Sequence, residues 1–235
     1  MHDPAIAAAN LDALAAFDTP TICNALELLD KDLHAHGYTT RAFVCGFPRQ
    51  KPIVGYARTA TIRSTEPLGL SAAAQRALRD DYYRSIDAGP RPSIVVIQDL
   101  DDPPGCGAFW GEVQSAIHVG LGARGLVTNG SVRDIDQWAP GFQFLAGSIG
   151  PSHAYAKPVG FGEEVHVFGL RVRAGDILHA DRHGAVVVPP ELVRAVPAAA
   201  REIAAREARI LEVARAPGCT AEKLVAVFAQ LDAIH

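Results

Sequence analysis

The chain has 235 residues, of which 49% are hydrophobic and 20% are charged, with a formal net charge of -4 at pH 7. This composition is typical of a globular chain that buries a sizeable core, and it excludes intrinsic disorder. The basic residues are scattered rather than clustered, which argues against a nucleic-acid partner and favours a small molecule or a protein.

The cysteines and the N-terminal segment indicate the cellular compartment. Four cysteines lie far apart, without a CxxC pair, at Cys23, Cys45, Cys106 and Cys219. This spacing indicates neither a zinc cluster nor a disulfide framework, and it favours a reducing compartment. The alanine-rich N-terminus is interrupted by Asp3 and Asp12 and lacks a basic segment, so it fits neither a signal peptide nor a membrane-spanning helix. We therefore expect a cytoplasmic protein with no membrane partner.

The chain is expected to begin with helices and to continue into a strand. Residues 5–17 are rich in helix formers. Asp18 or Thr19 can cap a second helix that has Pro20 in its first turn. The stretch IVGYARTATIRS at 53–64 alternates apolar and polar residues, which predicts a half-buried strand.

A βαβ unit is predicted in the middle of the chain. Helical spacing at 70–87 is followed by a turn and by SIVVIQDL at 93–100, a continuous apolar run typical of a buried strand. Residues 112–122 fit a helix, and GLVTN at 125–129 fits a second buried strand. A helical crossover makes the two strands parallel, so the segments that follow them emerge at the same carboxyl edge of the sheet.

The last third of the chain is predicted to pass from strands to a helix. Residues 163–188 contain apolar stretches separated by Gly-Asp and His-Gly turns. Pro189 and Pro190 end the sheet, and a helix rich in Ala, Arg and Glu is expected from 191 to about 215. No repeat or long linker interrupts the pattern, so residues 1–235 are predicted to form a single α/β domain.

The carboxyl edge of the βαβ unit carries the candidate chemistry. Glu112 opens the helix, and the amides of Val113 and Gln114 in its first turn lack an intrahelical acceptor, so they can receive a carboxylate. Arg133 follows Glu112 after twenty intervening residues, and its planar guanidinium suits a two-pronged grip on that carboxylate. Asp134 can hold a hard cation such as Mg²⁺ through oxygen.

A purely structural interpretation of these residues also stays open at this point. Neighbouring Arg133 and Asp134 after a turn also fit a solvated helix start, in which Asp134 only favours the helix N-terminus. Glu112 also fits the first turn of a helix for the same electrostatic reason.

The stretch FWGEVQSAIHVGLGARGLVTNGSVRD resembles the family of 4-hydroxy-4-methyl-2-oxoglutarate aldolases and RraA-type regulators of ribonuclease E. The segments TPTICNALELL, IVGYARTATI and RAGDILHADRHGAVVVP are similar to other elements of this family, so the likeness spans most of the chain. The resemblance implies a swivelling β/β/α three-layer domain of the RraA-like type, with the βαβ unit carrying the site. It also implies a homotrimer or hexamer with sites near subunit interfaces.

The resemblance implies a class II pyruvate aldolase with oxaloacetate decarboxylase activity. Asp134 would bind Mg²⁺ or Mn²⁺, and Glu112 would hold metal-bound waters. The pyruvate end would be bound by the Arg133 side chain and the backbone around the helix start, at Gly111, Val113 and Gln114. Cleavage next to a 2-oxo acid leaves an enolate, whose developing charge a metal at the keto oxygen stabilises. The alternative is a non-catalytic, protein-binding regulator of ribonuclease E.

A Schiff-base aldolase is disfavoured by the lysines. Such an enzyme needs a lysine with a lowered pKa in an apolar pocket. The four lysines are Lys31, Lys51, Lys157 and Lys223, and none of them lies in the loops of the βαβ unit.

Three positions depart from the family pattern. Gln137 stands where the motif usually has an acid, so Asp136 is out of step with it; Asn24 replaces an aspartate; and His153 replaces part of a Ser-Pro-Arg segment.

Further candidates for the surroundings of the site are Asp136, His153, Asp181 and His183, because a histidine near neutral pKa suits proton transfer. Glu202 or Glu207 is a candidate for the glutamate that an adjacent subunit contributes in the aldolases. His118 is expected to be packed, and Cys106 has no partner that would identify it as a nucleophile.

Overall fold

The computed structural model describes residue 6 and residues 8–232. The helices in that range are α1 (Ala8–Leu14), α2 (Thr19–Leu29), α3 (Ala72–Asp87), α4 (Glu112–Gly120), α5 (Val196–Arg215) and α6 (Ala221–Asp232), with short 3-10 helices η1 (Lys31–Leu33) and η2 (Ile135–Gln137). The strands are β1 (Val44–Cys45), β2 (Ile53–Arg63), β3 (Ser93–Asp99), β4 (Ala123–Thr128), β5 (Ser131–Val132), β6 (Gln143–Ala146), β7 (Ser148–Ile149), β8 (Lys157–Phe161), β9 (Val165–Val167), β10 (Leu170–Val172), β11 (Ile177–Asp181) and β12 (Gly184–Val188).

The main sheet is mixed and has the order β1-β6-β4-β3-β2-β11-β12, with β8 paired to the far end of β2. β2, β3, β4 and β6 are parallel neighbours, and β11 runs antiparallel to β2. The predicted mixed α/β class is therefore confirmed. The alternation in 53–64 was expected to give a half-buried strand, but β2 is buried almost throughout. Helices cover one face of this central strand and β9 packs on the other, so Thr59 is buried as well, whereas Thr61 is half-buried.

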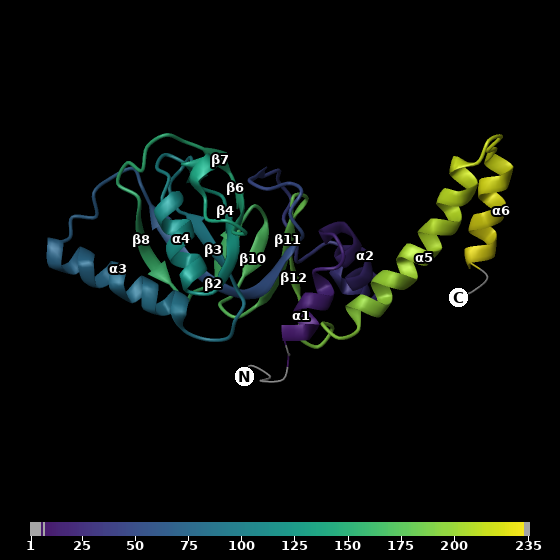
Figure 1. The fold of residues 1–235 in the computed structure, drawn as a ribbon, viewed down its shortest axis with the longest axis horizontal. Coiled ribbons are helices and arrows are strands. Elements are labelled where there is room, and N and C mark those ends of the chain that lie inside the picture. The colour runs from purple at the N-terminus through teal and green to yellow at the C-terminus, as the bar shows by residue number, and fades with distance from the viewer. Residues whose placement is uncertain (1–5, 7, 233–235) are drawn as a thin grey trace.

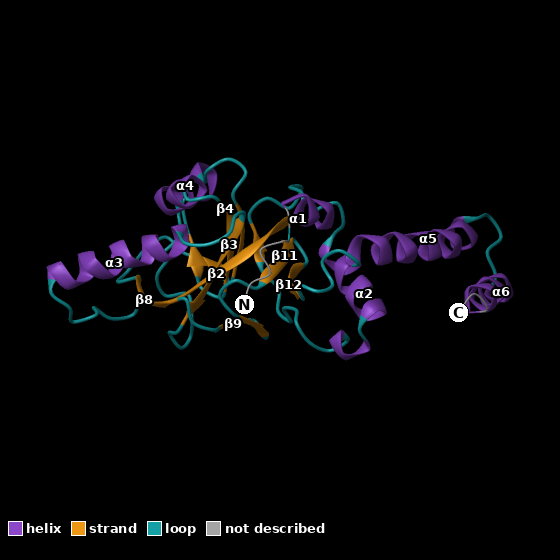
Figure 2. Ribbon diagram, turned by 90° about the horizontal axis from the view of Figure 1, so that it is seen from below, coloured by secondary structure: helices purple, strands orange, loops and turns teal. Residues whose placement is uncertain are grey.

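The predicted βαβ unit is confirmed as β3, α4 and β4. β3 and β4 lie side by side and parallel, with Ile97 opposite Thr128. The segments after Asp99 and Thr128 therefore leave the sheet at the same edge, as the crossover rule requires. In Figure 1, α4 lies in front of these strands, and Figure 2 shows it above the sheet from a second direction.

Helix start signals in the sequence correspond to the observed helix starts. Asp18 caps α2 by accepting a hydrogen bond from the amide of Thr21 at 3.0 Å, and Ser71 caps α3 in the same way through Ala74 at 3.2 Å. Both bonds satisfy amides that have no intrahelical acceptor. The last predicted helix begins later than expected, at Val196, because turns occupy 190–195 after the two prolines.

Helices α3 and α5 lie at opposite ends of the sheet (Figure 1). α3 projects at one end beside β8, whereas α5 leads away at the other end and α6 folds back against it (Figure 1). Arg209 of α5 and Gln230 of α6 are 3.4 Å apart at their side-chain termini. Between these ends, an aromatic core that includes Tyr82, Trp110 and Phe144 lies beneath α3 and α4. In the part of the chain that the structure describes, no helix is both long and apolar enough to cross a membrane.

Candidate functional site

A cavity of about 480 Å³ lies between α3, the start of α4 and the segment around β8. Its lining contains six of the residues singled out in the sequence: Gly111, Val113, Gln114, Arg133, Asp134 and His153. The βαβ crossover accounts for this convergence, because it brings the segments after β3 and β4 to one edge of the sheet.

Backbone bonds hold Arg133 and Asp134 beside the start of α4. Trp110 and Val132 form an isolated parallel bridge, and the amide of Arg133 donates to the carbonyl of Trp110 at 3.0 Å. Oδ2 of Asp134 then accepts a hydrogen bond from the amide of Glu112 at 3.3 Å. It also lies 3.4 Å from Nε of Arg133, and both side chains remain just over one-third exposed. The side chains of Arg133 and Asp134 therefore lie together at the start of α4, and both are accessible to a ligand.

The backbone of Asp134 aims its carboxylate at α4 rather than at its own helix. Asp134 has φ 53° and ψ 43°, in the left-handed region, and its side chain makes no capping bond to η2. Aspartate adopts this region more readily than most residues do, at a cost of about 1 kcal/mol. Asp134 therefore occupies the N-cap position of η2, but its carboxylate bonds to the first amide of α4 instead.

Gly111 makes room for this arrangement. A Cβ added at Gly111 would overlap Oδ2 of Asp134 and would lie 3.2 Å from Cγ of Arg133. As the N-cap residue of α4, Gly111 has no side chain that could bond to the first turn. The amides of Val113 and Gln114 have no acceptor within an α-helix, so the first turn is available to an anion.

Glu112 stands at the first position of α4 and is exposed to solvent. Its backbone amide contacts Asp134, and its carbonyl accepts the hydroxyl of Ser115 at 2.8 Å. Its side chain does not line the cavity. The predicted proximity of Glu112 and Asp134 therefore comes from the backbone of Glu112 and not from its side chain.

The wall contributed by α3 was missed in the sequence. The hydroxyl of Tyr83 lies 3.2 Å from Oε1 and 3.1 Å from Nε2 of Gln114, so it joins α3 to the first turn of α4. Helical spacing alone could not show which face of α3 meets another helix. Its apolar residues are separated by charged ones, which is also typical of an exposed helix.

His118 is packed beneath the cavity, as predicted. It is fully buried, with Nδ1 2.7 Å from the carbonyl of Gln114 and Nε2 2.9 Å from the hydroxyl of Tyr82. A carbonyl only accepts, so Nδ1 carries the proton and Nε2 accepts from Tyr82. Burial lowers the pKa of His118 to about 4, despite the opposing effect of the Gln114 carbonyl. His118 is therefore a neutral residue that fixes Tyr82.

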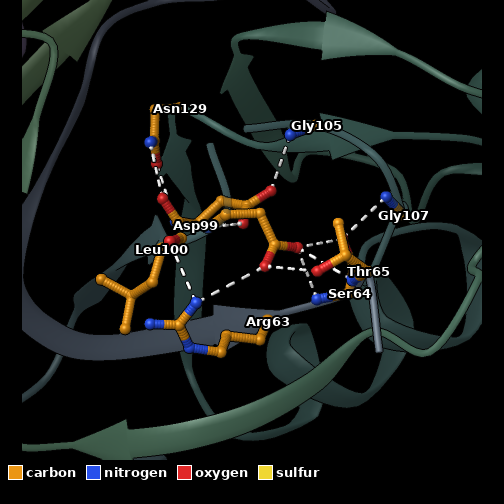
Figure 3. Close-up of polar contacts among 9 residues, drawn as sticks. Arg63, Ser64, Thr65, Asp99, Leu100, Gly105, Gly107 and Asn129 are labelled. Atoms are coloured by element: carbon orange, nitrogen blue, oxygen red, sulfur yellow. Dashed lines mark hydrogen bonds and ion pairs between the residues drawn. The ribbon is translucent and has the colours of Figure 1, made fainter. Parts of the chain in front are cut away.

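A buried carboxylate anchors the loop that leads to the cavity (Figure 3). Oδ2 of Asp101 accepts hydrogen bonds from the amide and hydroxyl of Ser64, both at 2.7 Å, and from the amide of Thr65 at 3.0 Å. Its Oδ1 accepts the hydroxyl of Thr65 at 3.0 Å. The Ser64 hydroxyl accepts a hydrogen bond from the amide of Gly107 at 3.0 Å. The loop that carries Trp110 and Gly111 is therefore tied to the end of β2.

Asp99 and Asn129 complete this anchor. The Asn129 side chain accepts the amide of Asp99 at 2.8 Å and donates to its carbonyl at 3.0 Å, so it continues the pairing of β3 beyond the end of β4. The carboxylate of Asp99 accepts the amides of Asp101 and Gly105 at 3.0 and 2.7 Å. Desolvation raises the pKa of Asp99, and the two amides only partly oppose it. The sequence signal for this anchor is the run of acids directly after a buried strand.

Opposing effects act on the pKa of Asp101. Desolvation by itself raises it, but the hydrogen bonds from Ser64 and Thr65 outweigh burial, so the pKa is lowered. The carboxylate is also 3.7 Å from the guanidinium of Arg63, and only 1% of its side chain is exposed. Asp101 is therefore a buried anion whose charge is stabilised by donors on the neighbouring strand.

Other predicted site residues lie outside the cavity. Asp136 is exposed on η2, and Glu207 lines a separate groove between α2 and α5. Asp181 and His183 line another cavity, of about 430 Å³, at the opposite sheet edge. The reason is that β11 runs antiparallel to β2, with Ala180 opposite Ile53 at the start of that strand. Within one chain, Glu207, Asp181 and His183 are not brought to Arg133 and Asp134.

His153 and Lys157 line the cavity in ways that the sequence left open. Nδ1 of His153 is 2.6 Å from the carbonyl of Ala154, so this nitrogen donates, because a carbonyl only accepts. Lys157 also lines the cavity, although the sequence places it outside the βαβ loops. It is exposed, whereas an amine-dependent aldolase needs a desolvated lysine.

The donor set suits a cation that keeps most of its water. Among the described residues, no group of three or more His, Cys, Asp or Glu side chains is placed to hold a metal ion. The available ligand at the cavity is the carboxylate of Asp134; the side chain of Glu112 starts from the neighbouring residue of α4 but does not line the cavity. Mg²⁺ commonly binds through one or two carboxylates plus water and substrate oxygens, so the residues present fit such an ion.

The comparisons with known proteins agree with the fold. Residues 19–187 match the family described as RraA-like: Aldolase/RraA. An uncharacterized protein from Pseudomonas syringae has a similar structure, with a TM-score of 0.69, 23% identity and 94% of each chain covered.

Two further solved structures are similar. Streptomyces coelicolor RraAS2, described as an unusual member of the RNase ES inhibitor RraA protein family, has a TM-score of 0.67 and 17% identity, covering 86% of this chain and 95% of that one. The RNA-processing inhibitor RraA from Thermus thermophilis has a TM-score of 0.50 and 20% identity, covering 70% and 92%. No curated protein matches the sequence.

Proposed function

The chain belongs to the RraA-like family, and from this premise we propose that it is a divalent-metal-dependent carbon-carbon lyase acting on a small 2-oxo acid. The reaction class is that of a pyruvate aldolase such as 4-hydroxy-4-methyl-2-oxoglutarate aldolase, with decarboxylation of oxaloacetate as the related activity. The observation that supports it is the position of Arg133 and Asp134 beside the open first turn of α4 in one cavity.

The substrate carboxylate would bind between Arg133 and α4. The guanidinium offers two parallel donors, and the amides of Val113 and Gln114 offer two more at the positive end of the helix. This arrangement holds the 2-oxo acid end in one orientation and leaves its keto oxygen on the side of Asp134. The neighbouring Asp134 carboxylate would repel the substrate carboxylate, so Arg133 also sets which end of the substrate binds there.

Asp134 would hold the cation, either Mg²⁺ or Mn²⁺, and Glu112 would hold part of its water shell. When bound, the cation supplies Lewis-acid stabilisation of the negative charge that develops on the keto oxygen. The left-handed backbone of Asp134 and the missing side chain of Gly111 keep the carboxylate at this place. Tyr83, bonded to Gln114, closes the wall beside it.

The test is pyruvate release from 4-hydroxy-4-methyl-2-oxoglutarate and from oxaloacetate, measured with Mg²⁺, with Mn²⁺ and after chelation. We expect turnover with either metal and loss of turnover in the chelator. Asp134→Asn should abolish metal-dependent turnover and weaken Mn²⁺ binding followed by paramagnetic resonance. Asp136→Asn, an exposed carboxylate two residues away, is the matched control and should keep both. An absence of metal-dependent turnover on a panel of 2-oxo acids would contradict the proposal.

A second function is motivated by the names of two similar structures, which are described as RNA-processing or RNase inhibitors. In this alternative the chain is a protein-binding regulator of ribonuclease E and the cavity has no physiological turnover. A pull-down of the nuclease that is equally strong with the Asp134→Ala variant, in a chain inactive on 2-oxo acids, would favour the regulator.

A homotrimer or hexamer belongs to the same proposal. Helix α5, which carries Glu207, and helix α3, which lines the cavity, are at opposite ends of one chain (Figure 1), so only a second copy could bring this glutamate to the site. Light scattering gives the mass of the assembly. If the assembly forms, Glu207→Gln should lower activity without changing that mass.

A further inference from the structure

The cavity is larger than a pyruvate unit requires. Its volume of about 480 Å³ falls within the range of roughly 300–1,000 Å³ that holds ligands of drug size. The proposed contacts of a 2-oxo acid, at Arg133, Asp134 and the start of α4, occupy one end of this space. Most of the remaining wall is contributed by α3 and β8, so these elements are placed to bind the part of a substrate that does not react.

The wall of the cavity has an apolar stretch. Leu78 and Tyr83 of α3 face the cavity together with Phe109, Val113 and Pro158. Val113 is 66% exposed, so its side chain is accessible to a ligand in the cavity. Contact with an apolar group would remove these side chains from water, and this favours a hydrocarbon or aromatic segment over a polar one.

The cavity is also cationic beyond Arg133. Arg76 and Arg79 of α3 and Lys157 of β8 line it, whereas Asp134 is its lining carboxylate. Arg79 is partly neutralised, because its Nη2 is 2.7 Å from Oδ1 of Asp80. Arg76 has no ion-pair partner among the residues that the structure describes. An anionic group is therefore the natural ligand of Arg76.

The geometry of α3 gives the spacing of these features. Tyr83 contacts Gln114 at the proposed reaction centre, and Arg76 lies seven residues earlier on the same helix. At a rise of 1.5 Å per residue, the two positions are about 10 Å apart along the axis. Leu78 lies between them on the cavity side. The order along the wall is thus 2-oxo acid site, apolar stretch and cation.

We propose that the natural substrate is an elongated 2-oxo acid, whose non-reacting arm is an apolar or aromatic segment that lies on Leu78 and Tyr83 and ends in an acidic group at Arg76. This inference rests on the proposed lyase function and goes beyond it by naming the arm. Leu78 and Arg76 are then specificity-determining residues with no part in the bond cleavage itself.

The test is calorimetric binding of three 2-oxo acids in the presence of Mg²⁺. The probes are 2-oxobutanoate, 4-phenyl-2-oxobutanoate and 4-(4-carboxyphenyl)-2-oxobutanoate, which add the apolar segment and then the terminal acid. We expect affinity to rise by roughly tenfold with the phenyl group and several-fold more with the carboxylate. The inference is overturned if 2-oxobutanoate binds and the phenyl group adds nothing. If none of the three binds, the proposed 2-oxo acid site fails as well.

Variants on α3 separate the two contributions. Leu78→Asn should remove the gain from the phenyl group, and Arg76→Gln should remove only the gain from the terminal carboxylate. Neither should change the affinity for 2-oxobutanoate. Arg84→Gln is the matched control, because Arg84 lies on the same helix and pairs with Asp81 away from the cavity. If Arg84→Gln lowers affinity for the carboxylated probe as much as Arg76→Gln does, a general charge effect replaces the specific contact.

Discussion

The carboxylate of Asp134 accepts a hydrogen bond from the backbone amide of Glu112 at 3.3 Å. The two residues belong to the segments that follow β3 and β4 at the carboxyl edge of the sheet, and the bond fixes one acid at the N-terminus of α4. Helix N-termini favour negative charge, so the fold itself stabilises the carboxylate that the proposed function assigns to the cation.

Substitution of Gly111 by alanine should disable the site without unfolding the chain. The new Cβ would overlap the Asp134 carboxylate, and the collision would displace it from the amide of Glu112. We expect loss of most metal-dependent activity, by at least about tenfold, because misplacement of a group by 1 Å has effects of this size or larger.

Gly120→Ala is the matched control for this substitution. Gly120 lies at the other end of α4, and a Cβ there meets nothing within 4 Å. This variant should keep full activity and gain some stability, since alanine favours a helix over glycine by up to about 1 kcal/mol. Equal activity losses in both variants would indicate damage to the helix rather than to Asp134.

Replacement of Arg133 by lysine should affect binding more than turnover. Lysine keeps the charge but cannot form two parallel bonds to a carboxylate. We expect KM for the 2-oxo acid to rise by roughly ten- to hundredfold, in line with the loss of a charge-assisted hydrogen bond. Steady-state kinetics with saturating metal separate KM from kcat. Arg124→Lys, which changes an arginine paired with Asp12 elsewhere, should leave both constants unchanged.

The part of the site that could be predicted is the part governed by a general rule of connection. Two apolar runs joined by a helix form parallel strands, and this places Arg133 and Asp134 beside the residues at 112–114. No local pattern encodes the direction of β11, however, so the sequence alone does not show that Asp181 and His183 lie at the opposite edge.

The wall of the cavity could not be predicted because it depends on long-range packing. The sequence of α3 indicates a helix, but its contact with β8 and with Gln114 is set by the whole core. The hydrogen bonds of Asp101 could not be predicted for the same reason. Its partners Ser64 and Thr65 lie at the end of another strand, and only the register of β2 against β3 brings them together.

Asp101→Asn should destabilise the protein, since an amide cannot present acceptors to all four donors from Ser64 and Thr65. We expect a loss of about 1–3 kcal/mol in the free energy of unfolding, measured by urea denaturation at pH 7. Asp102→Asn, an exposed neighbour, should change it by less than about 0.5 kcal/mol.

Because the pKa of Asp101 is lowered on folding, the contribution of Asp101 to stability is present above its unfolded pKa of about 3.9. This contribution is lost as pH falls through the folded value.

The free energy of unfolding should fall as pH is lowered from 6.5 to 4, because two histidines are buried. Burial lowers the pKa of both His118 and His179 to about 4, whereas an unfolded histidine titrates near 6.5. In this window the unfolded chain binds more protons than the folded chain, so stability falls as pH falls. The two histidines make their full contribution to the free energy of unfolding above pH 6.5. At pH 5, about 2 kcal/mol of the contribution of each histidine should be lost.

Urea unfolding of His118→Gln at pH 7.5 and pH 5 isolates one of these contributions. The substitution itself disturbs the bonds to Tyr82 and Gln114 and lowers stability at both pH values. The drop between the two pH values should nevertheless be smaller than in the wild type by about 2 kcal/mol, because a glutamine does not titrate. His36→Gln, which changes an exposed histidine, should keep the wild-type drop. A drop that is unchanged in His118→Gln would mean that His118 is not held neutral between Gln114 and Tyr82.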